Sequence, residues 1–371
     1  IKKKNRSRSF IHGMVVFLAL VVAAVPGIAS AGPVTDAAGR HVTVPDNPKR
    51  ILLGFYFEDY FAVAGPRGYD RVVAISRDAW EAWRHLQRQT YVKAVPRIAQ
   101  LVDVGEVTGG TFSLEKVMAA RPDLALLSSW QFSAPGDQVA RLEAAGSPGV
   151  VLDYNAQTVE KHVASTLVLG EILGAEARAR ELATLYADAH KDVARRVANI
   201  TSRPKVYVEL ARHGAGEVDN SYGDVMWGAM VTAAGGDNIG KGKIAKWGPL
   251  SPEYVLAQNP ERVVLAGSGW MSREKAVVLG PGVKRSLNHA RMRPYLDRPG
   301  WRGLAAVRAG QVYAVYHGGA RTLYDFAYLQ YLARMLHPDL FADVDPAANL
   351  AAYFEKYNPV RLTGTDITRL P

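Results

Sequence analysis

Arginine side chains and the aromatic side chains of Trp, Tyr and His gather in the segments that follow short apolar runs of this chain. A guanidinium group pairs with carboxylate or catecholate oxygens, and an indole ring covers a flat apolar face. Open parallel sheets bind ligands beyond the carboxyl ends of their strands, so we expect these segments to line one cleft. The candidate ligand-binding residues are Tyr56, Trp80, Trp83, Arg84, Arg97, Trp130, His213, Tyr222, Trp247, Trp270, His317 and Arg321.

Catalytic motifs are absent from the sequence. It contains no HExxH, no GxxxxGK[ST] and no GxSxG pattern, and Gly267-Ser268-Gly269 lacks the flanks of a nucleophile elbow. The nine histidines never pair at metal-ligand spacing on one element. We therefore expect a binding protein without a catalytic site, a resident metal or a cofactor. A secreted α/β hydrolase or transferase that uses the same cleft is the alternative from another class.

The short apolar runs predict the strands of two α/β units. Those of the first unit are residues 50–54, 71–76, 123–127 and 150–153, and those of the second are 205–210, 262–266 and 312–315. Continuous Val, Ile and Leu runs that alternate with helical segments predict parallel sheets covered on both faces. Residues 32–173 would form an N-terminal lobe and residues 201–371 a C-terminal lobe, with the ligand cleft between them.

A long helical segment connects the two predicted lobes. Residues 174–200 are rich in Ala, Glu, Arg and Lys, with apolar residues at helical spacing and no Pro or Gly after Gly174. At a rise of about 1.5 Å per residue, such a helix extends nearly 40 Å. We expect it to join the lobes rigidly and to limit their closure to a small tilt. Outside this frame, the sequence predicts a hairpin at residues 34–45 and helices at 321–336 and 347–357.

The first 31 residues have the order of a secretory signal peptide. A basic head at positions 2–8 precedes an apolar run from Met14 to Val25, and Ala29-Ser30-Ala31 supplies the small residues of a cleavage site. The apolar run is shorter than the roughly 20 residues that span a bilayer, which disfavours the alternative of a membrane anchor. We expect cleavage after Ala31 and a mature protein in the periplasm.

The net charge and the cysteine content limit the kinds of binding partner and covalent attachment that this chain can have. The net charge falls from +10 to +5 without the signal segment, because five of the 45 basic residues and none of the 35 acidic residues lie in it. This mild excess suits an anionic ligand or a solvated basic surface, and it is not typical of nucleic-acid binding. The sequence has no cysteine, which excludes disulfides, thiolate metal ligands and a lipid anchor on cysteine.

Six segments stand out as an ordered set: VTDAAGRHVTVPDNPKRIL (34–52), GTFSLEKVMAARPDLALL (110–127), AAGGDNIGKG (233–242), LSPEYVLAQNPERVVLAG (250–267), WRGLAAVRAGQVYAVYHG (301–318) and LHPDLF (336–341). Together they resemble one known family, the periplasmic binding proteins of iron-siderophore, haem and cobalamin ABC importers. They extend over nearly all of the mature sequence. The resemblance implies two lobes joined by a rigid helix.

The resemblance also implies partners. One glutamate on each lobe would dock into arginine pockets of an inner-membrane ABC permease dimer, and the matching positions are Glu115 and Glu253. We expect a monomer that delivers an anionic metal complex, with a ferric siderophore as the leading candidate. Cobalamin, an oxyanion such as molybdate, and haem remain alternatives. Haem would want an axial Tyr or His, for which Tyr56, His213 and His317 are candidates.

Overall fold

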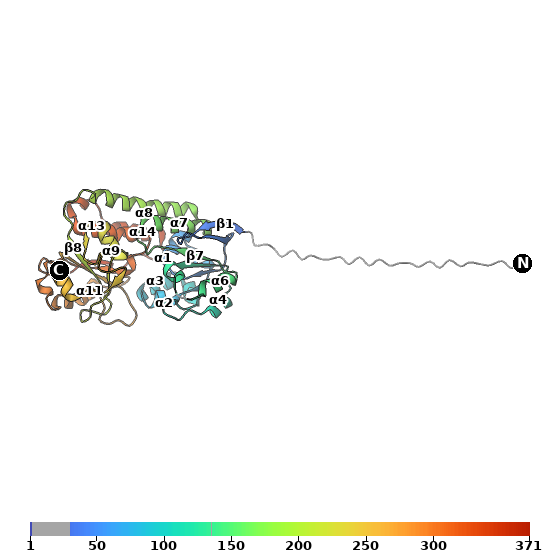
Figure 1. Cartoon of the computed structure of the whole chain (residues 1–371), viewed down its shortest axis with the longest axis horizontal. Coiled ribbons are helices and arrows are strands. Elements are labelled where there is room, and N and C mark those ends of the chain that lie inside the picture. The colour runs from blue at the N-terminus through green and yellow to red at the C-terminus, as the bar shows by residue number, and fades with distance from the viewer. Residues whose placement is uncertain (2–29, 135) are drawn as a thin grey trace.

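A computed structural model describes residue 1 and residues 30–134 and 136–371, so most of the expected signal peptide lies outside the described residues. Two α/β lobes lie side by side, and one long helix runs along both of them (Figure 1). In the part of the chain that the structure describes, no helix is long and apolar enough to span a membrane. The expected two-lobed architecture is therefore present.

The N-terminal lobe contains a five-stranded parallel sheet with the order β5-β4-β3-β6-β7. Its strands are β3 (Ile51–Leu53), β4 (Val72–Ile75), β5 (Val102–Asp103), β6 (Leu124–Ser128) and β7 (Gly149–Leu152). The four predicted strands are confirmed, whereas β5 is too short for a sequence signal. The lobe's helices are α1 (Phe57–Ala64), α2 (Arg77–Glu81), α3 (His85–Ala94), α4 (Leu114–Ala120), α5 (Ser129–Phe132) and α6 (Gln138–Ala144).

The C-terminal lobe repeats this plan with the order β10-β8-β12-β13-β14. Its strands are β8 (Lys205–Leu210), β10 (Asp237–Asn238), β12 (Arg262–Gly267), β13 (Val312–Tyr316) and β14 (Ile367–Arg369). The predicted parallel pairing is present between β10, β8, β12 and β13, and one edge strand departs from it, because the chain end returns as β14 antiparallel to β13. The helices are α9 (Met226–Ala233), α10 (Pro252–Gln258), α11 (Arg285–Met292), α12 (Ala305–Arg308), α13 (Asp325–Leu336) and α14 (Pro346–Tyr357).

Smaller elements complete the two lobes. The predicted hairpin is present as β1 (Ser30–Thr35) and β2 (His41–Pro45), and β1 includes the last two residues of the expected signal segment. A second antiparallel pair joins β9 (Ser221–Tyr222) to β11 (Trp247–Gly248) beside the cleft. Single 3₁₀ turns lie at Gly68–Arg71, Pro96–Gln100, Arg293–Asp297, Trp301–Gly303, His317–Gly319 and Pro338–Phe341.

The helix between the lobes is α8 (Glu176–Val197), which follows α7 (Val159–Leu173). Gly174 ends α7 in the left-handed region at φ 65°, where glycine carries no Cβ penalty. The buried face of α8 includes Leu182, Tyr186 and Val193, as its helical spacing predicts. Its 22 residues extend about 33 Å. This helix is slightly shorter than the predicted segment and packs against α7 and α13.

Buried polar contacts also join the lobes. Asp59 on α1 accepts a 2.6 Å hydrogen bond from the backbone N–H of Leu323, just before α13. Between the same two lobes, His162 on α7 lies 3.2 Å from the carboxylate of Asp325 on α13. Both of these side chains are fully buried. The lobes are thus connected by α8 and by side chains that cross between them.

Candidate ligand-binding cleft

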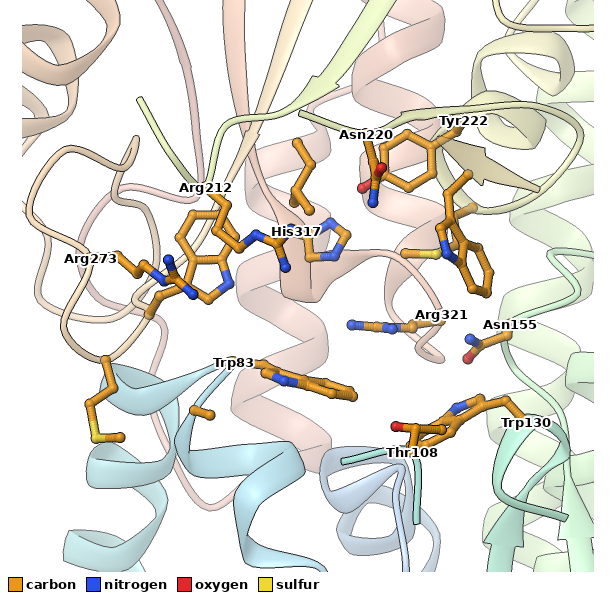
Figure 2. Close-up of a pocket in the computed structure, with 16 residues that line it drawn as sticks. Trp83, Thr108, Trp130, Asn155, Arg212, Asn220, Tyr222, Arg273, His317 and Arg321 are labelled. Atoms are coloured by element: carbon orange, nitrogen blue, oxygen red, sulfur yellow. The ribbon is translucent and has the colours of Figure 1, made fainter. Parts of the chain in front are cut away.

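A cavity of about 470 Å³ opens between the lobes (Figure 2). Its walls come mainly from segments that follow strands in both sheets, as expected for open α/β sheets. Seven of the twelve candidate ligand-binding residues line it: Trp83, Trp130, Tyr222, Trp247, Trp270, His317 and Arg321. The structure therefore brings together more than half of the candidate set.

The N-terminal lobe contributes an uncharged, aromatic wall. Trp83 follows α2 and Trp130 lies in α5, and their ring centroids are 6.0 Å apart. Phe55 packs in a T-shaped arrangement against both rings, with centroid distances of 6.1 Å to Trp83 and 5.4 Å to Trp130. The indole Nε1–H of Trp130 is buried and has no hydrogen-bond partner among the described residues. This wall offers flat apolar faces and one unused donor.

Asn155 stands at the edge of this wall with a fixed orientation. The Tyr56 hydroxyl donates to Asn155 Oδ1 over 3.0 Å, and Tyr56 itself accepts from the backbone N–H of Tyr154 at 3.2 Å. Burial raises the pKa of Tyr56, so its hydroxyl keeps its proton. The carboxamide oxygen of Asn155 is thereby occupied, which leaves its NH₂ group as a donor at the cavity (Figure 2).

Arg321 is the central cation of the C-terminal wall. It follows the 3₁₀ turn after β13, has a left-handed φ of 60° and is 9% exposed. Its guanidinium lies 5.3 Å over the Phe55 ring. Among the described residues it has no ion-pair partner, and its buried Nε has no acceptor. Burial, and then the nearby charge of Arg84, lower its pKa to about 10, so it stays protonated at neutral pH.

Two further arginines stand on the C-terminal side of the cleft. Arg212 lies 3.3 Å from Asp219, whereas Arg273 is exposed and lies 3.4 Å from His213. These arginines also border an adjoining hollow of about 440 Å³. His213 lines that hollow and not the main cavity, so its predicted position is corrected.

His317 lies against the end of the C-terminal sheet beside Arg321 (Figure 2). Its Nδ1 accepts a 3.1 Å hydrogen bond from the indole Nε1 of Trp227, a fully buried residue of α9. Burial, followed by the charges of Arg321 and Arg84, holds the pKa of His317 well below its usual value. At neutral pH this side chain is therefore an uncharged imidazole.

Four other candidate residues occupy structural positions behind the cavity wall. Trp80 is fully buried, stacks on Phe57 at 4.5 Å and donates to Gln87. Arg97 donates to backbone carbonyls of the N-terminal lobe at 2.9–3.3 Å.

Arg84 is buried against Glu58, with 2.5 Å between the charged atoms. Tyr56 forms the support of Asn155 already described. The sequence-based placement of Trp80, Arg84, Arg97 and Tyr56 on the cavity wall is wrong, because local buried partners engage each side chain.

Several lining residues were not among the candidates. They are Ala82, Thr108, Asn155, Leu210, Arg212, Asn220, Met226, Met271 and Arg273. Asn155 follows the end of β7 by a few residues, and Arg273 follows the candidate Trp270. The rule that ligand-binding residues follow strand ends could therefore have included both of them. Thr108 follows the two-residue strand β5, which has no sequence signal. Among the described residues, no group of three or more His, Asp or Glu side chains is arranged to hold a metal.

Glu115 and Glu253 occupy equivalent places in the two lobes. Each is exposed in the first turn of a seven-residue helix, α4 or α10, that begins at a serine N-cap, Ser113 or Ser251. An N-terminal helix position favours a carboxylate by itself. The structure therefore places both glutamates on exposed helix starts.

The equivalence extends beyond these helices, although no repeat is evident in the sequence. Each helix ends at a left-handed residue, Arg121 at φ 45° or Asn259 at φ 46°, followed by proline. The next residue is acidic and accepts a backbone N–H just before or at the start of the neighbouring strand: Asp123 from Lys49 at 2.8 Å and Glu261 from Lys205 at 3.1 Å. The lobes thus share one structural unit.

Comparison with known proteins agrees with this architecture. A family model described as periplasmic binding protein matches residues 70–316. An uncharacterized ABC transporter substrate-binding lipoprotein, YvrC of Bacillus subtilis, is 24% identical over 321 residues, which are 84% of this chain and 88% of that protein.

Solved structures show the same two-lobed arrangement. The TroA-like periplasmic binding protein FepB from Veillonella parvula has a TM-score of 0.84 and 30% identity, over 92% of this chain and 100% of the other. The molybdate-bound MolA of Haemophilus influenzae has a TM-score of 0.70 at 16% identity, over 90% and 100%, and shows the fold alone. On this evidence, the chain belongs to the periplasmic binding protein family.

Proposed function

We propose that this protein captures an anionic metal complex, with a ferric siderophore as the leading candidate, and delivers it to an ABC importer. Arg321 carries the proposal, because its buried guanidinium faces the cavity and has no counter-ion in the part of the chain that the structure describes. Burying an unpaired charge is costly, and a bound anion offsets that cost. Transport by an ABC permease is supported by the ABC transporter relative.

The aromatic lining supports a complex with flat faces over a bare ion. Trp83, Trp130 and Trp270 lie around a volume of about 470 Å³, which suits a compact organic ligand. Catecholate rings would stack on these indoles while their oxygens meet the guanidinium groups. A bare oxyanion such as molybdate, the ligand of the relative MolA, is the second candidate because hydrogen-bond donors converge near Arg321.

Native mass spectrometry of protein isolated from its own periplasm would identify the cargo. We expect the isolated protein to carry an added mass that contains iron and an organic chelator. Tryptophan fluorescence titration with the ferric tris-catecholate complex is the matched measurement in vitro, because several indoles line the cavity. Recovery of haem or molybdate would replace the siderophore in this proposal, and a neutral cargo would contradict the role of Arg321.

We further propose that Glu115 and Glu253 dock on the two halves of a permease dimer, with the protein acting as a periplasmic monomer after signal-peptide cleavage. An exposed ion pair contributes about 0–1 kcal/mol, so these contacts would orient the complex more than hold it. The double change to Ala should leave ligand affinity intact and abolish uptake in reconstituted vesicles.

Glu160 and Glu355 supply a matched control for this experiment. Both are exposed glutamates, one on α7 and one on α14. These two helices lie beside α8, on the side of the molecule opposite α4 (Figure 1). Their double change to Ala alters the charge by the same amount and should leave uptake unchanged. Wild-type uptake by the Glu115/Glu253 variant would refute the docking role.

A further inference from the structure

We propose that His317 binds an oxygen of the ligand as an uncharged Nε2–H donor, in a tautomer that Trp227 imposes, and does not coordinate a metal. The inference rests on the proposed function to the extent that the cleft holds a ligand. It adds the chemistry of one end of the site. At this end the cargo presents oxygen acceptors and brings its metal already coordinated.

The tautomer follows from the chemistry of the indole ring. The Trp227 Nε1–H is a donor and has no lone pair to accept with, so His317 Nδ1, 3.1 Å away, must be the acceptor. A neutral imidazole then carries its proton on Nε2. Burial, and then the nearby arginines, lower the pKa of the ring and keep it neutral, as described above. Since His317 lines the cavity, the Nε2–H is the group it offers to a ligand.

The groups around His317 are also hydrogen-bond donors. Within residues 30–134 and 136–371, Arg321 Nε and Trp130 Nε1 have no hydrogen-bond acceptor, and Tyr56 turns the carboxamide of Asn155 to present its NH₂. Figure 2 shows Arg321 between His317 on one side and Asn155 and Trp130 on the other. None of the sixteen lining residues drawn there is Asp or Glu. This corner therefore favours a carboxylate, hydroxamate, catecholate or oxometalate oxygen.

Metal coordination by His317 would require a different proton position. For Nε2 to give its lone pair to a metal, the ring proton would have to move to Nδ1. That proton would then face the Trp227 N–H, so two donors would oppose each other 3.1 Å apart. The buried indole would lose its acceptor, which is unfavourable. The local geometry thus disfavours His317 as a ligand of iron, haem or any other metal.

Nitrogen-15 NMR of the histidine-labelled full chain tests the tautomer without any cargo. The His317 resonances are assigned by their loss in H317Q. We expect an Nε2-protonated neutral ring from pH 6 to 8, unchanged by Zn²⁺ at a concentration equal to that of the protein. In W227F, where the indole donor is absent, the Nδ1–H tautomer should become populated. A charged ring at pH 7, an Nδ1–H ring in the wild type, or Zn²⁺ binding at His317 Nε2 would overturn the proposal.

Binding measurements test the donor role with two probes, the ferric tris-catecholate complex and sodium molybdate. H317Q places an amide NH₂ near the position of Nε2 and should keep probe affinity within about threefold, whereas H317L should weaken it about tenfold. Equal losses in both variants would overturn the donor role. If neither probe binds the wild type, the proposed cargo classes fail, while the NMR result still decides the tautomer.

Discussion

The two lobes share a scaffold and differ in the chemistry that they bring to the cleft. β3 and β6 of the N-terminal sheet correspond to β8 and β12 of the C-terminal sheet, down to the serine-capped helix before the second strand. Yet the N-terminal wall is uncharged and aromatic, while the lining arginines all lie on C-terminal segments. A repeated scaffold positions the segments that follow its strands, and the side chains of these segments determine what each lobe contributes to the cleft.

The difference is clearest at one pair of corresponding loops. The loop between β7 and α7 carries Asn155, and the loop between β13 and α13 carries His317 and Arg321. We infer a division of labour in which the C-terminal lobe attracts the anion and the N-terminal lobe covers its flat face. Four substitutions probe this comparison.

Asp325→Asn tests the seam that joins the lobes and should have the largest effect. We expect a loss of about 3–5 kcal/mol in the free energy of unfolding at pH 7, because His162 and His190 would lose their buried partner. Urea unfolding measures it. Asp339→Asn, at an exposed position, is the control.

The same variant carries a pH signature. Burial opposes ionisation of Asp325, but His162 and His190 hold its pKa down at about 2. Its stabilising effect is complete above the unfolded value of roughly 3.9 and is lost as the pH falls towards 2. The difference in the free energy of unfolding between wild type and variant should therefore become smaller below pH 4. A difference that stays constant with pH would show that the Asp325 carboxylate is not its source.

Arg321→Met tests the cationic side of the comparison. Affinity for the ferric tris-catecholate complex should fall about 100-fold, close to 2–3 kcal/mol, through loss of a charge-assisted contact. The ligand-free protein should become more stable by about 1–3 kcal/mol, because an unpaired buried charge is removed. Calorimetric titration and thermal unfolding measure both quantities. Lower stability together with unchanged affinity would assign Arg321 to the fold.

Trp83→Leu tests the aromatic side. Affinity for the ferric tris-catecholate complex should fall about tenfold, since a stacked aromatic pair is worth about 0.5–1.5 kcal/mol beyond its area. Ferric citrate is anionic and has no aromatic ring to stack on Trp83, so its affinity should hardly change in this variant. A similar loss for both chelates would mean that the N-terminal wall contributes more than stacking.

Arg273→Gln should have the smallest effect. Arg273 is exposed, so solvent weakens its attraction to an anion, and we expect a loss of about 0.2–1 kcal/mol in ligand affinity at low salt. The loss should disappear at 1 M salt, where the Debye length is about 3 Å. Titrations at the two salt concentrations check it. A loss that persists in high salt would indicate a direct, desolvated contact.

Local patterns were sufficient for the scaffold. The run at residues 205–210 is β8 to the residue, and the Ala-rich segment after Gly174 is the helix between the lobes. Both are signalled by neighbours in sequence, through continuous apolar runs or 3.6-residue spacing. The short strands β5 and β10 and the antiparallel β14 have no such signal, because pairing with distant strands creates them.

The sequence by itself determined that Trp and Arg residues follow the strands; the tertiary structure decided which of them face the ligand. Trp80 and Trp83 belong to one short segment, yet Phe57 and Gln87 bury the first while the second lines the cavity. Arg84 and Arg321 both lie over Phe55, but Glu58 from another helix neutralises Arg84 alone. A residue's type sets what it can bind, whereas partners distant in sequence determine whether that capacity is already used.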